Sequence, residues 1–173
     1  MNLIVAVDEK WGIGREGKLL ANIPGDRQYF KEKTIGKIVV MGRKTLESIP
    51  NKRGLANRKN YVLSRNGEFV AERCETVHTE EELYYRLKGT EPDNIFIIGG
   101  DSIYRKFYKK CTKCYVTKMY ADLNADRFMV NLDEDPDFNL VKESEMHVEN
   151  GINYRFLVYE NRKAMEKRGK IEQ

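Results

Sequence analysis

The segment NIFIIGGDSIYRKFY, residues 94–108, gives the clearest indication of the fold. It starts with a continuous apolar run, which is typical of a strand buried on both faces of a parallel sheet. Gly99 and Gly100 end that run, and a segment of helical character follows directly from 101 to 108. A buried strand that leads straight into a helix is typical of β-α-β units, so the segment predicts an α/β domain.

The same alternation extends from this segment towards both ends of the chain. Further strands are predicted at 2–7, 37–42, 60–64, 75–78, 113–120, 138–144 and 153–160, and further helices at 25–34, 43–49 and 79–88. Thr79 and Glu82 form a capping box at the start of the last of these helices. Asn150-Gly151 is a hairpin signal, so the terminal strands should lie antiparallel.

We therefore expect one α/β domain over residues 1–160, followed by a charged C-terminal tail at 161–173. Its mainly parallel central sheet should have about eight strands, an antiparallel C-terminal edge and flanking helices. A chain of 173 residues is long enough for one sizeable core and short for two.

The composition argues against several classes of protein. Hydrophobic residues make up 40% and charged residues 34%, which is typical of a globular rather than a disordered chain. No apolar run approaches ~18 residues, and Asp8 and Glu9 come too early for a signal peptide. The net charge of +4 is mild and lies partly in the tail, which does not favour nucleic-acid binding. We expect a cytoplasmic protein without nucleic-acid or membrane partners.

The three cysteines, Cys74, Cys111 and Cys114, do not suggest a disulfide framework, because their number is odd and small. Cys111 and Cys114 have the CxxC spacing, but the chain has no second CxxC and only two histidines. We expect no metal site, and surface or partly buried thiols at the start of a strand.

Two strand-to-helix junctions could bind a phosphate. Gly42 precedes Arg43, Lys44 and Thr45, and the pair Gly99-Gly100 precedes Ser102. A helix N-terminus offers free N–H groups, and glycine lets a phosphate approach them closely. Each glycine could instead simply end its strand, but two junctions at neighbouring strand ends together favour a dinucleotide.

Ser64 and Arg65 follow another predicted strand and suit an additional phosphate, such as the 2′-phosphate of NADP. On its own this signal is weak, because an arginine after a strand is usually solvated. The chain has no GxGxxG motif, so the ordinary Rossmann fingerprint is absent.

Asp26 follows Pro24-Gly25 and opens a predicted helix. It could be an acid that the helix dipole favours, which is a common arrangement. It could equally be a carboxylate at the floor of a pocket that pairs with a cationic or amidine-like ligand. Composition does not decide between these two interpretations.

Five sequence blocks, in order and with the matching spacing, resemble the dihydrofolate reductase family, and the resemblance spans about residues 2–160. The blocks are AVDEKWGIGREGKLLANIPGDRQYF (6–30), VVMGRKTLESIP (39–50), NRKNYVLSR (57–65), IFIIGGDSIY (95–104) and CYVTKMYADLNADRF (114–128). The resemblance implies a dihydrofolate reductase-like fold, a monomer, and reduction of 7,8-dihydrofolate to 5,6,7,8-tetrahydrofolate with NADPH. Hydride would pass to C6 and a proton to N5, through a water, for one-carbon metabolism and thymidylate synthesis.

The resemblance also assigns roles to individual residues. Asp26 would hold the pteridine and promote protonation at N5, and Thr117 would hydrogen-bond its carboxylate. The implied substrate or antifolate contacts, for inhibitors of the trimethoprim or methotrexate class, are Val5, Ala6, Asp26, Arg27, Phe30, Ile49, Leu55, Arg58, Ile98 and Thr117. The implied cofactor contacts are Ala6, Ile13, Gly14, Gly42, Arg43, Lys44, Thr45, Leu63, Ser64, Arg65, Ile98, Gly99, Gly100, Ser102, Ile103 and Tyr104. A cis Gly99–Gly100 peptide and a mobile loop at 9–23 that closes over the nicotinamide are also implied.

The sequence departs from the family pattern in places. The usual Leu-Pro-Trp reads Leu19-Leu20-Ala21, so the pocket mouth loses an aromatic ring. Trp11 could swing in as a substitute, although packing within its own loop is the simpler interpretation. Arg127 stands where threonine is common. Two other functions stay open: a catalytically silent NADP- or antifolate-binding homologue, and a pyrimidine reductase of the riboflavin pathway.

Overall fold

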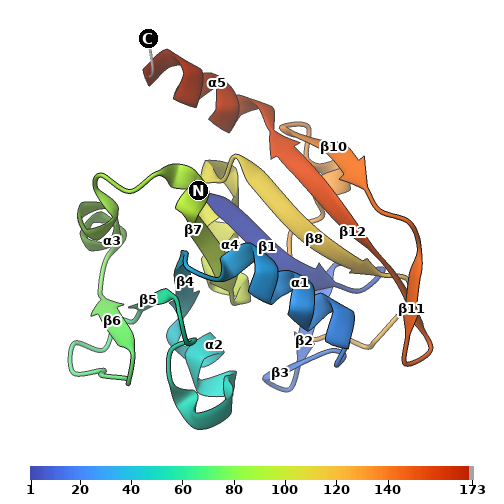
Figure 1. Ribbon diagram of the computed structural model, residues 1–173, viewed down its shortest axis with the longest axis horizontal. Helices are drawn as coiled ribbons and strands as arrows, with labels where there is room; N and C mark the ends of the chain where they lie inside the picture. The colour runs from blue at the N-terminus through green and yellow to red at the C-terminus, as the bar shows by residue number, and fades with distance from the viewer. Residues whose placement is uncertain (172–173) are drawn as a thin grey trace.

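The computed structural model describes residues 1–171 and places a mainly parallel sheet at its centre (Figure 1). The strand order is β10-β12-β8-β1-β7-β4-β5-β6, and β11 pairs with β12. The strands are β1 (Asn2–Val7), β4 (Ile38–Gly42), β5 (Lys59–Leu63), β6 (Cys74–Val77), β7 (Ile95–Gly99), β8 (Lys113–Met119), β10 (Phe138–Glu143), β11 (His147–Glu149) and β12 (Ile152–Asn161).

The strands from β8 to β6 pair in parallel, whereas β12 is antiparallel to both β8 and β10. The expected fold class, a mainly parallel sheet with an antiparallel C-terminal edge, is therefore confirmed. Each strand and helix that the sequence predicts occurs within one residue of its expected ends, because buried β-branched runs leave little choice of register.

Helices cover both faces of the sheet. They are α1 (Pro24–Thr34), α2 (Arg43–Ser48), α3 (Glu80–Leu87), α4 (Asp101–Phe107) and α5 (Arg162–Ile171), with 3-10 turns at Pro50–Lys52, Pro92–Asn94, Tyr108–Lys110 and Leu132–Glu134. In Figure 1, α1 crosses in front of the sheet and α4 lies behind it. None of the described helices is long and apolar enough to cross a membrane.

Alternate residues of β1 fill two separate cores, because successive side chains of a strand point to opposite faces. Leu3, Val5 and Val7 pack with residues of α3 and α4. Ile4 packs on the other face, in the cluster that includes Leu46 of α2 and is lined by residues of α1. The sheet is therefore buried on both faces, as its unbroken apolar strands predict.

Local signals in the sequence fix several element ends. The Thr79 hydroxyl accepts the N–H of Glu82 at 3.0 Å, as the capping box predicts. The Glu82 carboxylate reaches back to the N–H of His78 at 2.8 Å, one residue before the usual partner. Asn150 and Gly151 both adopt left-handed φ values, of 51° and 73°, which is the geometry of a tight hairpin turn.

That turn joins β12 to β11, a short strand that the sequence analysis did not predict. The predicted partner, β10, pairs instead with the far half of β12, with a register shift between Leu140 and Lys142. Three residues are too few to give a recognisable alternation, so β11 could not be distinguished from loop.

A second small sheet was also missed. The segment expected as a mobile loop at 9–23 contains β2 (Gly12–Arg15) and β3 (Lys18–Leu19), which pair with β9 (Arg127–Phe128) in the order β3-β2-β9. Asp126 holds this segment with its N–H on Gly14 O and its carboxylate on the N–H of Glu16, both at 2.9 Å. β2 and β3 are short, and β2 pairs with β9, which lies more than a hundred residues away, so local patterns do not encode this sheet.

The segment expected as a charged tail at 161–173 begins with Asn161, the buried last residue of β12, and continues as α5 to Ile171. Residues 172 and 173 lie outside the described part of the chain. The α5 helix is joined to the domain through Lys163 to Asp137 at 2.9 Å and Arg168 to Asp93 at 3.1 Å.

The cysteines are free thiols. Cys111 and Cys114 are fully buried, more deeply than expected, and burial raises the pKa of Cys111 to about 12 and that of Cys114 well above its usual range. Both thiols therefore stay protonated and serve as small apolar side chains at the start of β8.

Trp11 lies in the core rather than at the pocket mouth. It is 3% exposed, its ring meets that of Tyr159 edge-on at 5.9 Å, and the Lys118 ammonium lies 4.3 Å from its centre. Trp11 therefore has a packing role, but in the main core with Tyr159 of β12 rather than within its own loop, and it does not swing into the pocket.

We expect Trp11→Ala to lower the free energy of unfolding by about 3–5 kcal/mol, because it removes a buried aromatic ring from a closed core. Urea unfolding followed by far-UV circular dichroism measures this. Trp11→Phe, which keeps a ring against Tyr159, should cost clearly less. A loss below about 1 kcal/mol for the alanine variant would contradict the assignment of Trp11 to the core.

Candidate active site

The residues implied to bind the cofactor lie mostly at the carboxyl edge of the parallel strands, where open α/β sheets bind ligands, whereas Leu55 and Arg58 precede β5 at its opposite end. Ala6 lies beside Thr117 in the pairing of β1 with β8. Gly42 lies beside Leu63, and the neighbouring Met41 lies beside Gly99. Two groups result: an acid and its threonine near β1 and β8, and the glycine junctions near β4, β5 and β7.

Asp26 occupies the first turn of α1, which begins at Pro24. The Thr117 hydroxyl donates to Asp26 Oδ1 at 2.7 Å, so the predicted hydrogen bond is present. Thr117 is 2% exposed and sits between Ala6 of β1 and Phe156 of β12 in the sheet. The threonine therefore fixes the orientation of the carboxylate from the rigid centre of the sheet.

The surroundings of Asp26 raise the pKa of its carboxyl above the usual range. Burial is the main cause, because it disfavours the charged form. The hydrogen bond from Thr117 acts in the opposite direction, and the negative charge of Glu149 raises the pKa further. This environment differs from that of a simple helix-capping acid, and it favours the interpretation of Asp26 as a pocket carboxylate.

The predicted apolar contacts divide between the faces of the sheet. Phe30, Ile49, Leu55 and Ile98 all pack, partly buried, against one core cluster, the one on the α1 face. The side chain of Val5 instead belongs to the core on the opposite face. Half-buried Phe30 and its neighbours thus form an apolar wall next to Asp26, while Arg27 is exposed.

Arg58 is held at the end of this wall. Its Nε donates to Thr34 Oγ1 and its Nη1 to Ala56 O, both at 2.8 Å, and the guanidinium lies 5.8 Å from the centre of the Phe30 ring. Partial burial lowers the pKa of Arg58. A positive group at the end of an apolar wall suits a ligand with a terminal carboxylate.

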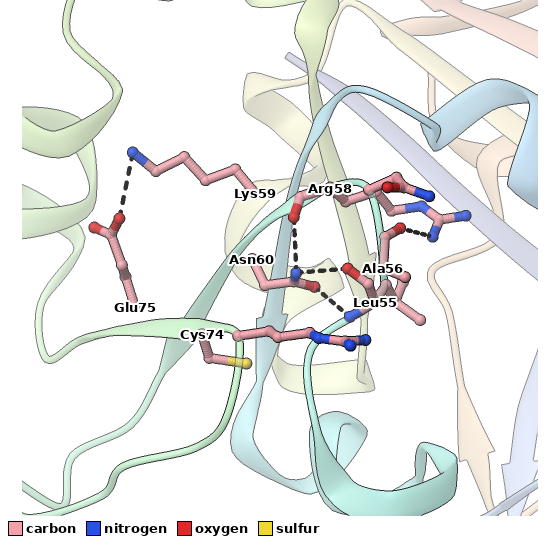
Figure 2. A pocket seen from close by; sticks show the side chains of 9 residues that line it. Leu55, Ala56, Arg58, Lys59, Asn60, Cys74 and Glu75 are labelled. Carbon is pink, nitrogen blue, oxygen red and sulfur yellow. Dashed lines mark hydrogen bonds and ion pairs between the residues drawn. The ribbon is translucent and has the colours of Figure 1, made fainter.

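The sequence analysis did not single out Asn60, which positions the loop of Arg58 (Figure 2). Its amide oxygen accepts the N–H of Leu55 at 2.9 Å, and its amide nitrogen donates to the carbonyls of Leu55 and Arg58. An open groove of about 700 Å³ runs past this loop and is lined by residues 55–60 and 73–75. The block NRKN contained this residue, but only the fold shows where its amide points.

The glycine junctions touch one another. A Cβ on Gly42 would lie 3.1 Å from Ile103, and one on Gly100 would lie 3.3 Å from the hydroxyl of Thr45 at the start of the other helix. The Gly99–Gly100 peptide is cis, as expected. The hydroxyl of buried Tyr104 donates to Ile4 O at 2.8 Å and holds α4 against the sheet. Ile103 is likewise buried and lies directly beside Gly42 of the other junction.

The predicted basic and polar groups surround these junctions. Arg43 Nε lies 3.6 Å from Glu47, and Lys44, Arg65 and Ser102 are exposed. Ser64 is 8% exposed, and its hydroxyl accepts the N–H of Asn66 at 3.2 Å. His78, which the sequence analysis did not consider, contacts Ser64 O through Nδ1 at 2.8 Å.

The small sheet closes one side of the site. Ile13 and Gly14 are half-buried on β2. Arg127 of β9 lies 3.9 Å from Asp101, the first residue of α4. Arg127, which stands where threonine is common, thus links β9 of the small sheet to the glycine junction at the start of α4.

The sequence and fold match known proteins over almost the whole chain. The family model described as dihydrofolate reductase matches residues 1–161. The chain belongs to the dihydrofolate reductase family. A dihydrofolate reductase of Staphylococcus haemolyticus is 34% identical over 92% of this chain and 95% of its own length. That of Bacillus subtilis (strain 168) is 31% identical over 95% and 96%.

A solved structure agrees with this assignment. The dihydrofolate reductase from Enterococcus faecalis, complexed with NADP(H) and RAB-propyl, superposes with a TM-score of 0.82 and is 29% identical. The match covers 92% of this chain and 95% of that one. The dihydrofolate reductase fold therefore extends to the arrangement of the strands that carry the site.

In this member of the dihydrofolate reductase family, apolar side chains surround the position where the usual tryptophan is absent. Leu20 and Ala21 pack against buried Ile23, Met119 and Tyr154. Phe156, which stacks on Tyr29 of α1 at 4.1 Å, belongs to the same group. Aromatic rings from β12 and α1 thus lie close to the position where the family usually has an indole.

The raised pKa of Asp26 makes a prediction about stability. A carboxyl whose pKa is higher in the folded than in the unfolded state stabilises the fold at low pH, and this contribution is lost as pH rises through the folded pKa. Asp26→Asn removes the ionisation while its amide oxygen can still accept the Thr117 hydroxyl. We expect the variant to be more stable than the parent at neutral pH, with the difference shrinking in acid.

Urea unfolding at several pH values measures this difference. Glu68→Gln, which neutralises an exposed loop carboxylate, provides the matched control and should change stability little. A variant that is less stable than the parent at neutral pH would contradict the raised pKa of Asp26.

Proposed function

We propose that this chain reduces 7,8-dihydrofolate to 5,6,7,8-tetrahydrofolate with NADPH, by hydride transfer to C6 and protonation at N5. The observation that carries the proposal is the partly buried Asp26–Thr117 pair on the same sheet edge as two touching glycine junctions. A carboxylate of this kind suits the amino group and ring N–H of a pterin, and the junctions suit a dinucleotide.

The residues of the junctions fit a bound nucleotide. A Cβ at Gly42 or Gly100 would crowd Ile103 or Thr45, so glycine lets the two junctions approach each other closely. The N–H groups at the starts of α2 and α4 would then be available to a phosphate. Residues 42–45 and 99–104 would hold the diphosphate, Ser64 and Arg65 the 2′-phosphate, and Ala6, Ile13 and Gly14 the nicotinamide side. When bound, NADPH supplies the hydride.

Asp26 would act on the pterin in two ways. Its carboxyl would pair with the 2-amino group and N3 and so fix the ring with C6 in reach. Its raised pKa would retain a proton to higher pH than an ordinary aspartate, which favours protonation of the bound ring. Among the proposed pocket residues no second side chain suits proton delivery to N5, so a water would carry that proton.

The remaining residues would orient the substrate and exclude water. Phe30, Ile49 and Leu55 would flank the p-aminobenzoyl group, and Arg58, held by Thr34, would pair with the glutamate α-carboxylate. The segment at 9–23 would cover the nicotinamide, with Asp126 holding it in the closed position. Antifolates of the trimethoprim or methotrexate class would compete for the same pocket.

Two alternatives are less well supported. A silent NADP- or antifolate-binding homologue would not need a partly buried carboxylate oriented by Thr117. A riboflavin-pathway reductase would need a pocket for a phosphorylated ribityl chain, whereas the wall beside Asp26 is apolar. We further propose that the enzyme is a cytoplasmic monomer that supplies one-carbon metabolism and thymidylate synthesis.

The direct test is the loss of absorbance at 340 nm when purified protein meets NADPH and dihydrofolate. We expect turnover in the parent and a loss of at least about 100-fold in Asp26→Asn at neutral pH, because the group that promotes protonation is gone. NADPH binding, measured by fluorescence, should stay nearly unchanged. An inactive parent would refute the function, and turnover within about threefold in the variant would refute the role of Asp26.

Arg65 provides a test of cofactor choice. We expect Arg65→Ala to raise the KM for NADPH about tenfold or more and to leave the KM for NADH unchanged, because only NADPH carries the 2′-phosphate. Arg105→Ala, an exposed arginine of α4, is the control. Equal effects on both cofactors would refute the assignment of Arg65 to the 2′-phosphate.

A further inference from the structure

A carboxylate from the far end of the chain caps the helix that carries Asp26. Both oxygens of Glu149, the last residue of β11, accept the N–H of Gly25, at 3.1 and 3.3 Å. Gly25 directly precedes Asp26 in the first turn of α1. A negative group at a helix N-terminus binds its free N–H groups and complements its dipole.

The same hairpin holds the chain just before this helix. The hydroxyl of Tyr154 donates to the Glu149 carboxylate. Asn150, at the turn, donates from Nδ2 to Asn22 O at 3.0 Å. A side chain at position 25 would overlap both Glu149 and Tyr154, so only glycine permits this approach. The β11–β12 hairpin therefore clamps the segment from Asn22 to Gly25.

The clamp is itself rigid. Tyr154 is 2% exposed, and its ring stacks on His147 at 5.3 Å and meets Phe156 edge-on at 5.5 Å. Phe156 in turn stacks on Tyr29, three residues after Asp26 in α1. The hairpin thus contacts α1 on both sides of Asp26, through a charged cap before it and an aromatic stack after it.

Several groups are coupled electrostatically to Asp26. Of the causes that act on the pKa of Asp26, burial is the largest, the hydrogen bond from Thr117 of β8 is next and the charge of Glu149 of β11 follows. The charge of Glu149 raises this pKa, and the hydrogen bond from Thr117 lowers it. In addition to burial, the charge of Asp26 in turn raises the pKa of Tyr29 of α1, Tyr104 of α4 and Tyr154 of β12.

We propose that Glu149 is a positioning residue for Asp26: held by Tyr154, it anchors the N-terminus of α1 and sets both the place and the electrostatic surroundings of the carboxyl. The inference rests on the proposed reductase function. It gives the β11–β12 hairpin a role in the pH range of the reaction.

The charge and the anchor can be separated by substitution. Glu149→Gln keeps an oxygen that accepts the Gly25 N–H and removes the charge, whereas Glu149→Ala removes both. Tyr154→Phe keeps the charge and removes the hydroxyl that holds it. Glu145→Gln, which neutralises an exposed carboxylate shortly before the same hairpin, is the matched control.

The decisive experiment is the pH profile of turnover for these variants, with KM measured for both substrates. Without the charge of Glu149 the pKa of Asp26 falls, so the decline of the rate with rising pH should begin at lower pH in Glu149→Gln. We expect turnover on the alkaline side to fall about three- to tenfold with the KM for NADPH unchanged. Glu149→Ala and Tyr154→Phe should in addition raise the KM for dihydrofolate.

Each outcome of these measurements tests either the role of Glu149 or the reductase function. A Glu149→Gln profile that superimposes on those of the parent and of Glu145→Gln would overturn the inference, even if stability changed. An inactive parent would refute the reductase function alone, since the pH dependence of urea unfolding reports the same shift without turnover. In that measurement the parent loses stability as pH rises through the pKa of Asp26, and Glu149→Gln should lose it at lower pH.

Discussion

A hydrogen bond between two distant parts of the chain, from Thr117 of β8 to Asp26 of α1, organises this molecule around a partly buried carboxylate. Burying a charged group is costly unless its surroundings compensate. Here one hydroxyl compensates in part, and the remaining cost raises the pKa of the carboxyl. The helix must begin at Pro24, and β8 must lie next to β1, for this pair to meet.

The nucleotide side of the site depends on a different constraint, which is the close contact of two glycine junctions. Their contact follows from the adjacency of β4 and β7, which aligns Met41 with Gly99 at the carboxyl edge. The parallel sheet therefore places the Asp26 carboxyl and the two glycine junctions, which we propose to bind phosphate, along one edge. Substrate and cofactor would meet between them, which is the geometry that hydride transfer requires.

Much of this arrangement is encoded locally. The buried strands and the glycine junctions could be predicted from apolar runs, and the resemblance to a family supplied the partnership of Asp26 with Thr117. Two of the interactions that escaped prediction join residues far apart in sequence: the pairing of β2 with β9 and the cap of Glu149 on Gly25. A third is local and consists of the hydrogen bonds of the Asn60 amide to Leu55 and Arg58. Single polar residues of this kind carry no periodic signal, and only the folded chain shows where they point.

The central claim is that the fold keeps the Asp26 carboxyl protonated to higher pH than an ordinary aspartate. A carbon-13 NMR titration of the aspartate carboxyl groups, assigned by comparison with Asp26→Asn, tests this directly. The account predicts that the resonance of Asp26 titrates above the usual range for aspartate, about 3.9, and above the exposed aspartates of the same sample. A resonance that titrates at or below that value would contradict it.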